Sequence, residues 1–245
     1  MSSGLTKKQQ AIADREIELI QLAKSLVQEQ GFANLTMDKL TASSPYSKGT
    51  IYNHFCSKED VILALCIHSL KSEAIFFERT AKFNGNTREK SCDACRLSYL
   101  RSYGASTINL CDCCKDALGS REASPKRVNE LNNLEEQVID GADALVNNAV
   151  ECGDLKFSPA IGSDAIVFAN WSIAFGSNAL AQNASNSRCI QRIQDPFSVL
   201  HNANMLLDGL GWSPLSTEWD YRKTWRRVEQ ELFSEELAYL ESVNR

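Results

Sequence analysis

The stretch from residue 32 to residue 58, FANLTMDKLTASSPYSKGTIYNHFCSK, decides the fold of this 245-residue chain. It indicates two short helices separated by a tight joint. The second helix is dense in small and hydrogen-bonding residues, where a core helix would carry Leu and Val. A helix of that composition suits a polar, anionic partner, and duplex DNA offers one. The stretch therefore predicts a DNA-reading helix.

Local signals set the limits of the two short helices. Thr36 can cap the first with its hydroxyl, and Ser44-Pro45 ends it because proline cannot continue the hydrogen-bond ladder. Ser47 can cap the second helix, and Gly49 lets the backbone approach a partner closely. These signals favour a helix-turn-helix arrangement.

The second short helix has an inward and an outward face. Ile51 and Phe55 lie four residues apart and can share the inward face. Ser57, followed three residues later by Asp60, is a capping-box pattern that opens the next helix. The outside of the second helix is then left to Lys48, Thr50, Tyr52, Asn53 and His54.

The spacing of these residues resembles that of the TetR family of bacterial transcriptional regulators. The matching positions are Gly31-Phe32, Thr36, the run SKGTIYNHF at 47–55 and the run SKED at 57–60. The resemblance covers roughly residues 10 to 70. One position departs from the family pattern: Pro45 stands where the family usually has Gly, and Tyr46 follows in place of an aliphatic residue. This departure leaves the geometry of the turn open.

The resemblance implies an all-α fold with two domains. A helix-turn-helix DNA-binding domain is expected over 1–65, and an effector-binding and dimerisation domain over 66–245. The implied function is sequence-specific transcriptional regulation by a homodimer, a repressor that a small-molecule effector releases from its double-stranded DNA operator.

The resemblance also implies which residues meet DNA. It assigns Tyr52 and His54 mainly to the phosphate backbone, while Lys48 and Asn53 have the chemistry to reach base edges. The full set of expected DNA-binding residues is Thr36, Ser47, Lys48, Gly49, Thr50, Tyr52, Asn53, His54 and Lys58.

The remainder of the chain also reads as helical, because apolar residues recur at helical spacing and no strand alternation is convincing. Five aromatic residues are candidates for the wall of an effector pocket: Phe77, Tyr99, Tyr103, Trp171 and Phe175. Helices are expected over 7–30, 58–82, 88–103, 107–118, 125–151, 159–183 and 194–209, and an amphipathic tail over 217–242.

Two of the late helices carry apolar faces with small residues that permit close approach, so they are expected to form the core of the homodimer. The residues of these faces are Ile166, Val167, Ala169, Ile173 and Ala174 in the first helix, and Phe197, Leu200, Ala203, Leu206 and Leu207 in the second.

Composition narrows the class of protein. The net charge is −5, yet residues 32–58 carry a local charge of +2, which is compatible with a DNA-reading segment on an acidic body. No run of 18 apolar residues is present, so no membrane span is expected, and the polar start does not look like a secretory signal. A cytoplasmic protein is the expectation.

Nine cysteines raise an alternative. The pairs Cys92-x2-Cys95 and Cys111-x2-Cys114 match a four-cysteine zinc spacing, so the alternative function is a regulator that senses a metal or an oxidant through these thiols. Against it, both pairs lie in segments that read as helix and coincide with apolar faces, where free Cys behaves as a small hydrophobe. We therefore expect a reduced, metal-free cluster, with Cys113 as the thiol off the apolar face.

No catalytic pattern is evident in the sequence. It contains no Ser nucleophile elbow, no Gly-rich phosphate loop and no paired carboxylates in an apolar setting. An enzyme is not expected, and neither is a cofactor.

Overall fold

The computed structural model describes residues 6–91, 117, 121–156, 161–183, 188 and 197–243. Across these ranges the regular structure is helical and no strand occurs, which confirms the all-α prediction. Among the described helices none combines the length and the apolar character that crossing a membrane requires. The expected helices of 88–103 and 107–118 lie almost entirely outside the described residues.

The chain divides into two compact units. The first comprises Met1–Lys71 and Ala105–Glu135, and the second comprises Ser72–Gly104 and Glu136–Arg245. Two long helices, α4 (Lys58–Lys82) and α7 (Pro125–Glu151), give their first turns to the first unit and their later turns to the second. A functional boundary at residue 65 stays a prediction.

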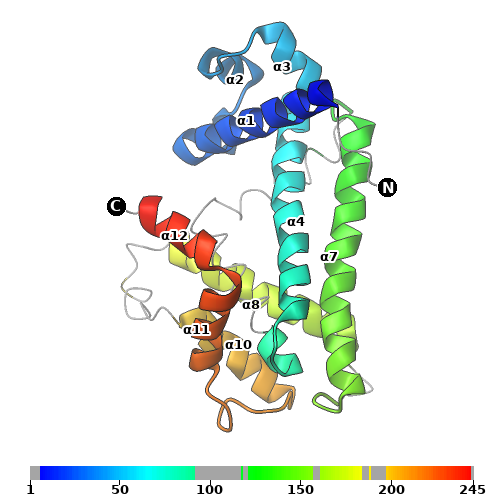
Figure 1. Ribbon diagram of the computed structural model, residues 1–245, viewed down its shortest axis with the longest axis vertical. Helices are drawn as coiled ribbons and strands as arrows, with labels where there is room; N and C mark the ends of the chain where they lie inside the picture. The colour runs from blue at the N-terminus through cyan, green and yellow to red at the C-terminus, as the bar shows by residue number, and fades with distance from the viewer. Residues whose placement is uncertain are drawn as a thin grey trace. The chain divides into compact units, whose positions relative to one another are not determined.

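The first unit gathers three further α-helices and a 3-10 turn around the start of α4 (Figure 1). Helix α1 (Lys7–Gln30) begins behind a capping box between Thr6 and Gln9 and is followed by Gly31, whose φ of +78° suits glycine. The predicted limits of α1 are thus confirmed. The other elements are η1 (Phe32–Asn34), α2 (Met37–Ser43) and α3 (Lys48–His54).

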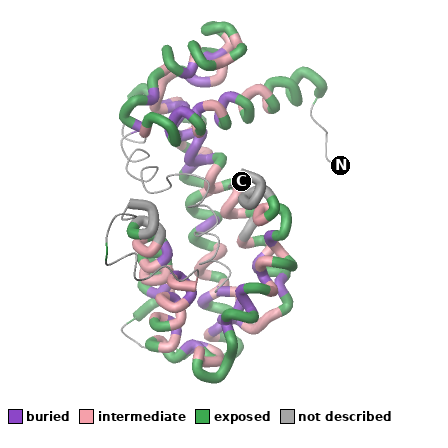
Figure 2. Tube along the Cα trace, turned by 90° about the vertical axis from the view of Figure 1, so that its left-hand side faces the viewer, coloured by how far each residue is buried: buried purple, intermediate pink, exposed green. Residues whose placement is uncertain are grey.

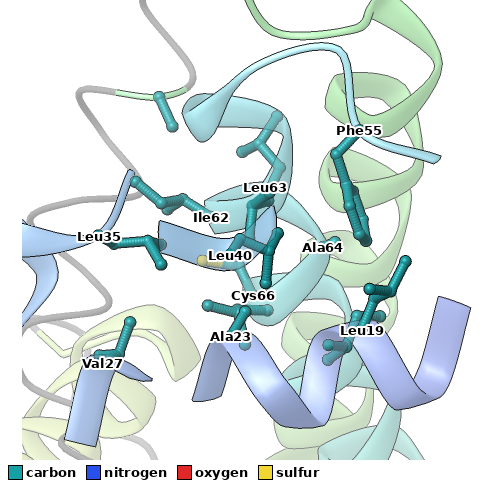
Figure 3. Packing of buried hydrophobic residues seen from close by; sticks show 14 of the residues in the cluster. Leu19, Ala23, Val27, Leu35, Leu40, Phe55, Ile62, Leu63, Ala64 and Cys66 are labelled. Atoms are coloured by element: carbon teal, nitrogen blue, oxygen red, sulfur yellow. The ribbon is translucent and has the colours of Figure 1, made fainter. Parts of the chain in front are cut away.

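One apolar core holds the first unit together (Figure 3). Leu19 and Ala23 of α1 meet Leu40 of α2 and Leu63 of α4, and each of these side chains is at most 1% exposed. Residues 60–67 of α4 are all buried, as the purple stretch of that helix in Figure 2 shows. After Asp60 this stretch is apolar on every face, because its neighbours cover it all round.

The second unit contains the later helices: α8 (Ser163–Asn183), α10 (Ser198–Gly209), α11 (Tyr221–Leu232) and α12 (Ser234–Val243). Helix α8 packs against α10. The amphipathic tail expected over 217–242 forms two helices, which are separated at Phe233. That residue leaves helical geometry and buries its ring against Phe83 and Val228.

A buried arginine organises the polar interior of the second unit. Arg88 is 0% exposed, and its Nη1 donates to the carbonyls of Trp212 (2.7 Å) and Pro214 (3.0 Å). The same atom lies 2.7 Å from the Asp208 carboxylate. Asp208 also accepts from the backbone and the hydroxyl of Ser216. Burial alone would raise the pKa of Asp208, but the bonds from Ser216 and Arg88 outweigh that effect. They hold the pKa below 3.8, the usual value of an aspartic acid.

The lowered pKa of Asp208 predicts acid-dependent stability. A carboxyl whose pKa is lower in the folded state stabilises the fold above its unfolded pKa, and this contribution is lost as pH falls through the folded pKa. Asp208→Asn should therefore lower the melting temperature at pH 7, and the gap to wild type should close as the pH is brought below 3.8. The exposed Glu231→Gln is the matched control. A gap that stays constant from pH 7 to pH 3 would contradict this account.

Candidate nucleic-acid interface

Both short helices, α2 and α3, begin at a side-chain cap. The Thr36 hydroxyl accepts from the amide of Lys39 (3.2 Å), and the Ser47 hydroxyl accepts from the amide of Thr50 (3.2 Å). Both predicted caps are confirmed. Ser57 likewise accepts from the amide of Asp60 at the start of α4 (3.1 Å). Capping matters here because a seven-residue helix leaves most of its end groups unpaired within itself.

The turn with Pro45 needs no left-handed residue. Among the described residues positive φ occurs only at Gly31, Gly153 and Gly211. Ser44 adopts an extended conformation at the end of α2, and its hydroxyl accepts from the amide of Tyr46 (3.1 Å). The chain therefore leaves α2 through an extended Ser44 and bends at Pro45 without a left-handed residue.

Tyr46 then fastens this turn to α1. Its hydroxyl donates to the Glu18 carboxylate, and the Arg15 guanidinium lies 5.2 Å from its ring centroid. The hydrogen bond to Glu18 raises the pKa of Tyr46 above its usual value. Tyr46 thus makes a hydrogen bond and a cation–ring contact to α1 that an aliphatic residue could not make.

Helix α3 buries one face and exposes the other. Ile51 and Phe55 are both 0% exposed and enter the core of the first unit. Lys48, Tyr52 and Asn53 are exposed on the opposite side. The predicted inward and outward faces of α3 are therefore present, with the exception of its last residue.

His54 faces inward, contrary to the outward position expected for it. Its side chain is 7% exposed, and Nδ1 lies 3.4 Å from the carboxylate of Glu16 on α1. The reason is the end of the helix: His54 is the last residue of α3, beside the buried Phe55, and α1 passes within reach of it. The structure thus gives His54 a partner within its own unit.

Lys48 is oriented from α2. Its Nζ donates to the Asp38 carboxylate at 3.1 Å and lies 5.6 Å from the Tyr52 ring centroid. The hydrogen bond to Asp38 raises the pKa of Lys48, so its charge is secure at neutral pH. The resulting surface presents a cation, an aromatic hydroxyl and the amide of Asn53 side by side, which is the chemistry that reads phosphates and base edges.

Three predicted contact residues lie at the edges of this surface. Thr36 is exposed, and Thr50 is half-buried with its hydroxyl 2.9 Å from that of Ser47. Lys58 donates to the carbonyl of Ala33 at 3.4 Å, which places its ammonium beside η1. The structure thus brings the predicted residues together around α3, apart from the inward side chain of His54.

Gly49 lies on the exposed side of α3 with space around it. A methyl group at this position would meet only the Ser47 hydroxyl, at 4.0 Å. Packing within the chain therefore does not require glycine here. The absent side chain leaves a gap on the outer face, which is useful where a backbone must approach a partner.

A small cavity of about 70 Å³ lies in the second unit. It is walled mainly by apolar residues of α7 and α8, and the polar groups at its edge are Glu73, Ser91 and Asn170. Of the predicted pocket residues, Phe77 and Trp171 line it, whereas Phe175 is not among the lining residues. The apolar wall consists of Phe77, Val138, Ile139, Ala142, Leu145, Val146, Ile166, Val167, Trp171, Ala174 and Trp212.

Several predicted residues lie outside the described part of the chain. These are Tyr99 and Tyr103 of the expected pocket and the cysteines at 92, 95, 111, 113 and 114. Within the described residues, Cys56, Cys66 and Cys152 form no disulfide. The same residues contain no cluster of three or more His, Cys, Asp or Glu side chains placed to hold a metal.

Known proteins resemble the chain in sequence. The sequence profile described as "Bacterial regulatory proteins, tetR family" matches residues 19–65. Uncharacterized HTH-type transcriptional regulators of Mycobacterium tuberculosis and Mycobacterium bovis are 38% identical to it over 158 residues, which is 61% of this chain and 69% of theirs.

Solved structures share the fold at low sequence identity. The fatty acid degradation regulator FadR of Bacillus halodurans aligns with a TM-score of 0.58 and 15% identity, over 80% of this chain and 95% of that one. The reduced form of NemR from E. coli aligns with a TM-score of 0.58 and 20% identity, over 80% and 96%. FadR of Bacillus subtilis, solved in complex with stearoyl-CoA, aligns with a TM-score of 0.55 and 16% identity, over 81% and 98%.

Gly49→Ala should change the stability of the protein and its affinity for DNA in opposite directions. Alanine favours a helix over glycine by roughly 0.5–1 kcal/mol, and the added methyl has room, so the variant should melt at a slightly higher temperature. The methyl should nevertheless weaken binding to a duplex that the wild-type protein selects from a random library, because it fills the gap on the outer face of α3. A variant that gains stability and keeps full affinity would show that DNA does not approach Gly49.

Proposed function

Because the chain belongs to the TetR family of bacterial regulatory proteins, we propose that it represses transcription from an operator and is released by a small molecule. DNA-binding transcriptional regulation is the general function of this family. The single observation that carries the proposal is the outer face of α3, where Lys48, Tyr52 and Asn53 are exposed over a buried Ile51 and Phe55.

In the proposed complex α3 enters the major groove. Lys48 and Asn53 reach base edges, because an ammonium can donate to guanine and an amide can pair with adenine. Tyr52 and Thr50 bond to phosphates, and Thr36, Ser47 and Lys58 flank them at the ends of the short helices. Gly49 allows the backbone to come close. The inward His54 acts through its contact with Glu16, which sets the end of α3.

The regulator acts as a homodimer in this proposal, because one short helix reads too few base pairs for specificity. Of the apolar residues expected at the dimer interface, Ile166, Ala174, Leu200, Ala203 and Leu207 are buried within the chain itself. The face left for a partner is different: Phe168, Trp171 and Phe175 of α8 share one side of that helix by spacing, and are 70%, 52% and 43% exposed.

The size and position of this exposed set favour a second copy of the chain as its partner. Large apolar side chains gathered on one helix face are costly in water, and an isologous dimer covers the same face on both copies. Met205 of α10 is also exposed, at 68%, and α10 packs against α8.

The effector site we propose is the cavity between α7 and α8. Its wall favours an apolar ligand with one polar end, which Glu73, Ser91 or Asn170 would meet. FadR of Bacillus subtilis, which shares the fold, was solved in complex with stearoyl-CoA, a molecule with a long apolar chain. Small-molecule pockets usually measure roughly 300–1,000 Å³, so a cavity of about 70 Å³ must widen to hold an effector.

That widening supplies a mechanism for release. A ligand shifts a two-state equilibrium only by its differential affinity for the two states. An effector that binds only the widened cavity therefore favours the conformation with that cavity, and DNA affinity falls if this conformation fits the operator less well.

The proposed reading face predicts two kinds of DNA-binding defect. Tyr52→Ala should weaken binding to every duplex, because it removes a contact to the phosphate backbone. Asn53→Ala should instead change the base preference, by about 1–3 kcal/mol at one position of the site, because it removes a contact to a base edge. Selection from a random duplex library, followed by titration of the selected and scrambled duplexes, measures both. Unchanged binding by both variants would refute the assignment of α3.

The proposed dimer face predicts that a charge placed on it changes the oligomeric state of the protein. The wild-type protein should sediment as a dimer at micromolar concentration, and Phe168→Glu should sediment as a monomer with an unchanged circular dichroism spectrum. Ile75→Glu is the matched control, since Ile75 is 51% exposed on α4 and lies outside the proposed face. A monomeric wild-type protein, or a Phe168→Glu variant that remains dimeric, would contradict the proposed interface.

A further inference from the structure

Arg127, in the first turn of α7, belongs to the same compact unit as the reading helix. Its side chain is only 12% exposed. A guanidinium buried to that extent requires acceptors around it, since an unpaired buried charge is strongly destabilising. The acceptors that Arg127 meets come from three different helices.

The contacts of Arg127 converge on the end of α3. Its Nη2 donates to the backbone carbonyl of His54 at 3.0 Å and lies 3.0 Å from the Glu16 carboxylate of α1. Its Nε lies 3.3 Å from the Asp60 carboxylate of α4. Its guanidinium carbon stands 5.0 Å from the centroid of the Phe55 ring. One cation thus joins α1, α3 and α4.

The carbonyl that Arg127 reaches is one that α3 cannot satisfy alone. The last carbonyls of a helix have no partner within it, and the C-terminal end of the helix dipole favours a cation. Helix α3 has only seven residues, too few to be stable without its surroundings. Arg127 therefore contributes to both the existence and the orientation of α3.

Further bonds fix the chain around Arg127 to the joint between α3 and α4. The Cys56 thiol and the Ser57 hydroxyl both donate to the carbonyl of Glu122, at 3.4 and 3.0 Å. Asp60 accepts from the amide of Ser124 at 3.2 Å, in addition to its pairing with Arg127. These bonds, together with those that Arg127 makes itself, fix the position of the guanidinium relative to α3.

We propose that Arg127 is a positioning residue for DNA reading, which holds the C-terminal end of α3 in its binding orientation from the first turn of α7. The proposal rests on the proposed function of α3. It assigns a role in recognition to a residue that lies some seventy positions beyond the helix-turn-helix stretch. Arg127 itself touches no DNA in this account.

The chain offers a matched control for the charge. Lys71 of α4 pairs with Glu130 of α7 at 2.6 Å, so Lys71→Met removes one cation between the same two helices without touching α3. Arg127→Met removes the cation and its hydrogen bonds but keeps an apolar side chain of similar length. Arg127→Lys keeps the charge and loses the forked geometry.

The test measures two affinities for each variant. The probes are a duplex that the wild-type protein selects from a random library and a scrambled duplex of the same composition. Arg127→Met should bind the selected duplex about tenfold more weakly, the equivalent of one charge-assisted hydrogen bond, and should bind the scrambled duplex as Lys71→Met does. Arg127→Lys should fall between Arg127→Met and wild type.

The outcomes separate this proposal from the function on which it rests. A folded Arg127→Met variant that binds the selected duplex as tightly as Lys71→Met does would overturn the positioning role. If the wild-type protein selects no duplex, the proposed function itself fails. If Arg127→Met does not fold, Glu16→Gln carries the test, because it weakens the same link at its α1 end. That variant should lose affinity for the selected duplex only, and unchanged affinity would overturn the proposal.

Discussion

Two seven-residue helices, α2 and α3, carry the surface that we propose meets DNA, and neither is long enough to be stable in water by itself. Everything else in the first unit compensates for that weakness. Leu40, Ile51 and Phe55, which are fully buried, anchor the short helices in a core supplied by α1 and α4. Burial of such side chains contributes roughly 1.5–3 kcal/mol each, more than caps or surface pairs provide. The outward face of the short helices can therefore be polar, because their inward face is apolar and buried in the core.

The short helices also depend on the long helices α4 and α7 for their packing. The first turns of α4 are buried on every side, and α7 brings Arg127 to the end of α3. Later turns of the same two helices line the cavity of the second unit, through Phe77 of α4 and Val138 of α7 among others. Each of these helices thus has residues in both the reading unit and the proposed effector site.

Signals that act over a few residues predicted most of the fold. Local residue patterns were enough to predict the helix caps and the limits of three long helices, because these features depend on neighbouring residues alone. The caps are Thr36, Ser47 and Ser57, and the helices are α1, α4 and α7. Contacts between distant segments could not be read in this way. The inward turn of His54 depends on Glu16, and nothing near residue 54 specifies that partner. Periodicity likewise found apolar faces on α8 and α10 but could not tell which residues face each other within one chain, such as Ile166 and Leu207, and which are left exposed.

The central claim is that α3 reads DNA from the major groove as part of a symmetric pair. A structure of the protein bound to a duplex selected from a random library tests it most directly. The account predicts a two-fold symmetric dimer whose α3 helices occupy successive major grooves, about 34–36 Å apart, with Lys48 and Asn53 at base edges and Arg127 still bonded to the carbonyl of His54. A complex in which α3 lies outside the groove, or in which another surface of the chain contacts the bases, would contradict it.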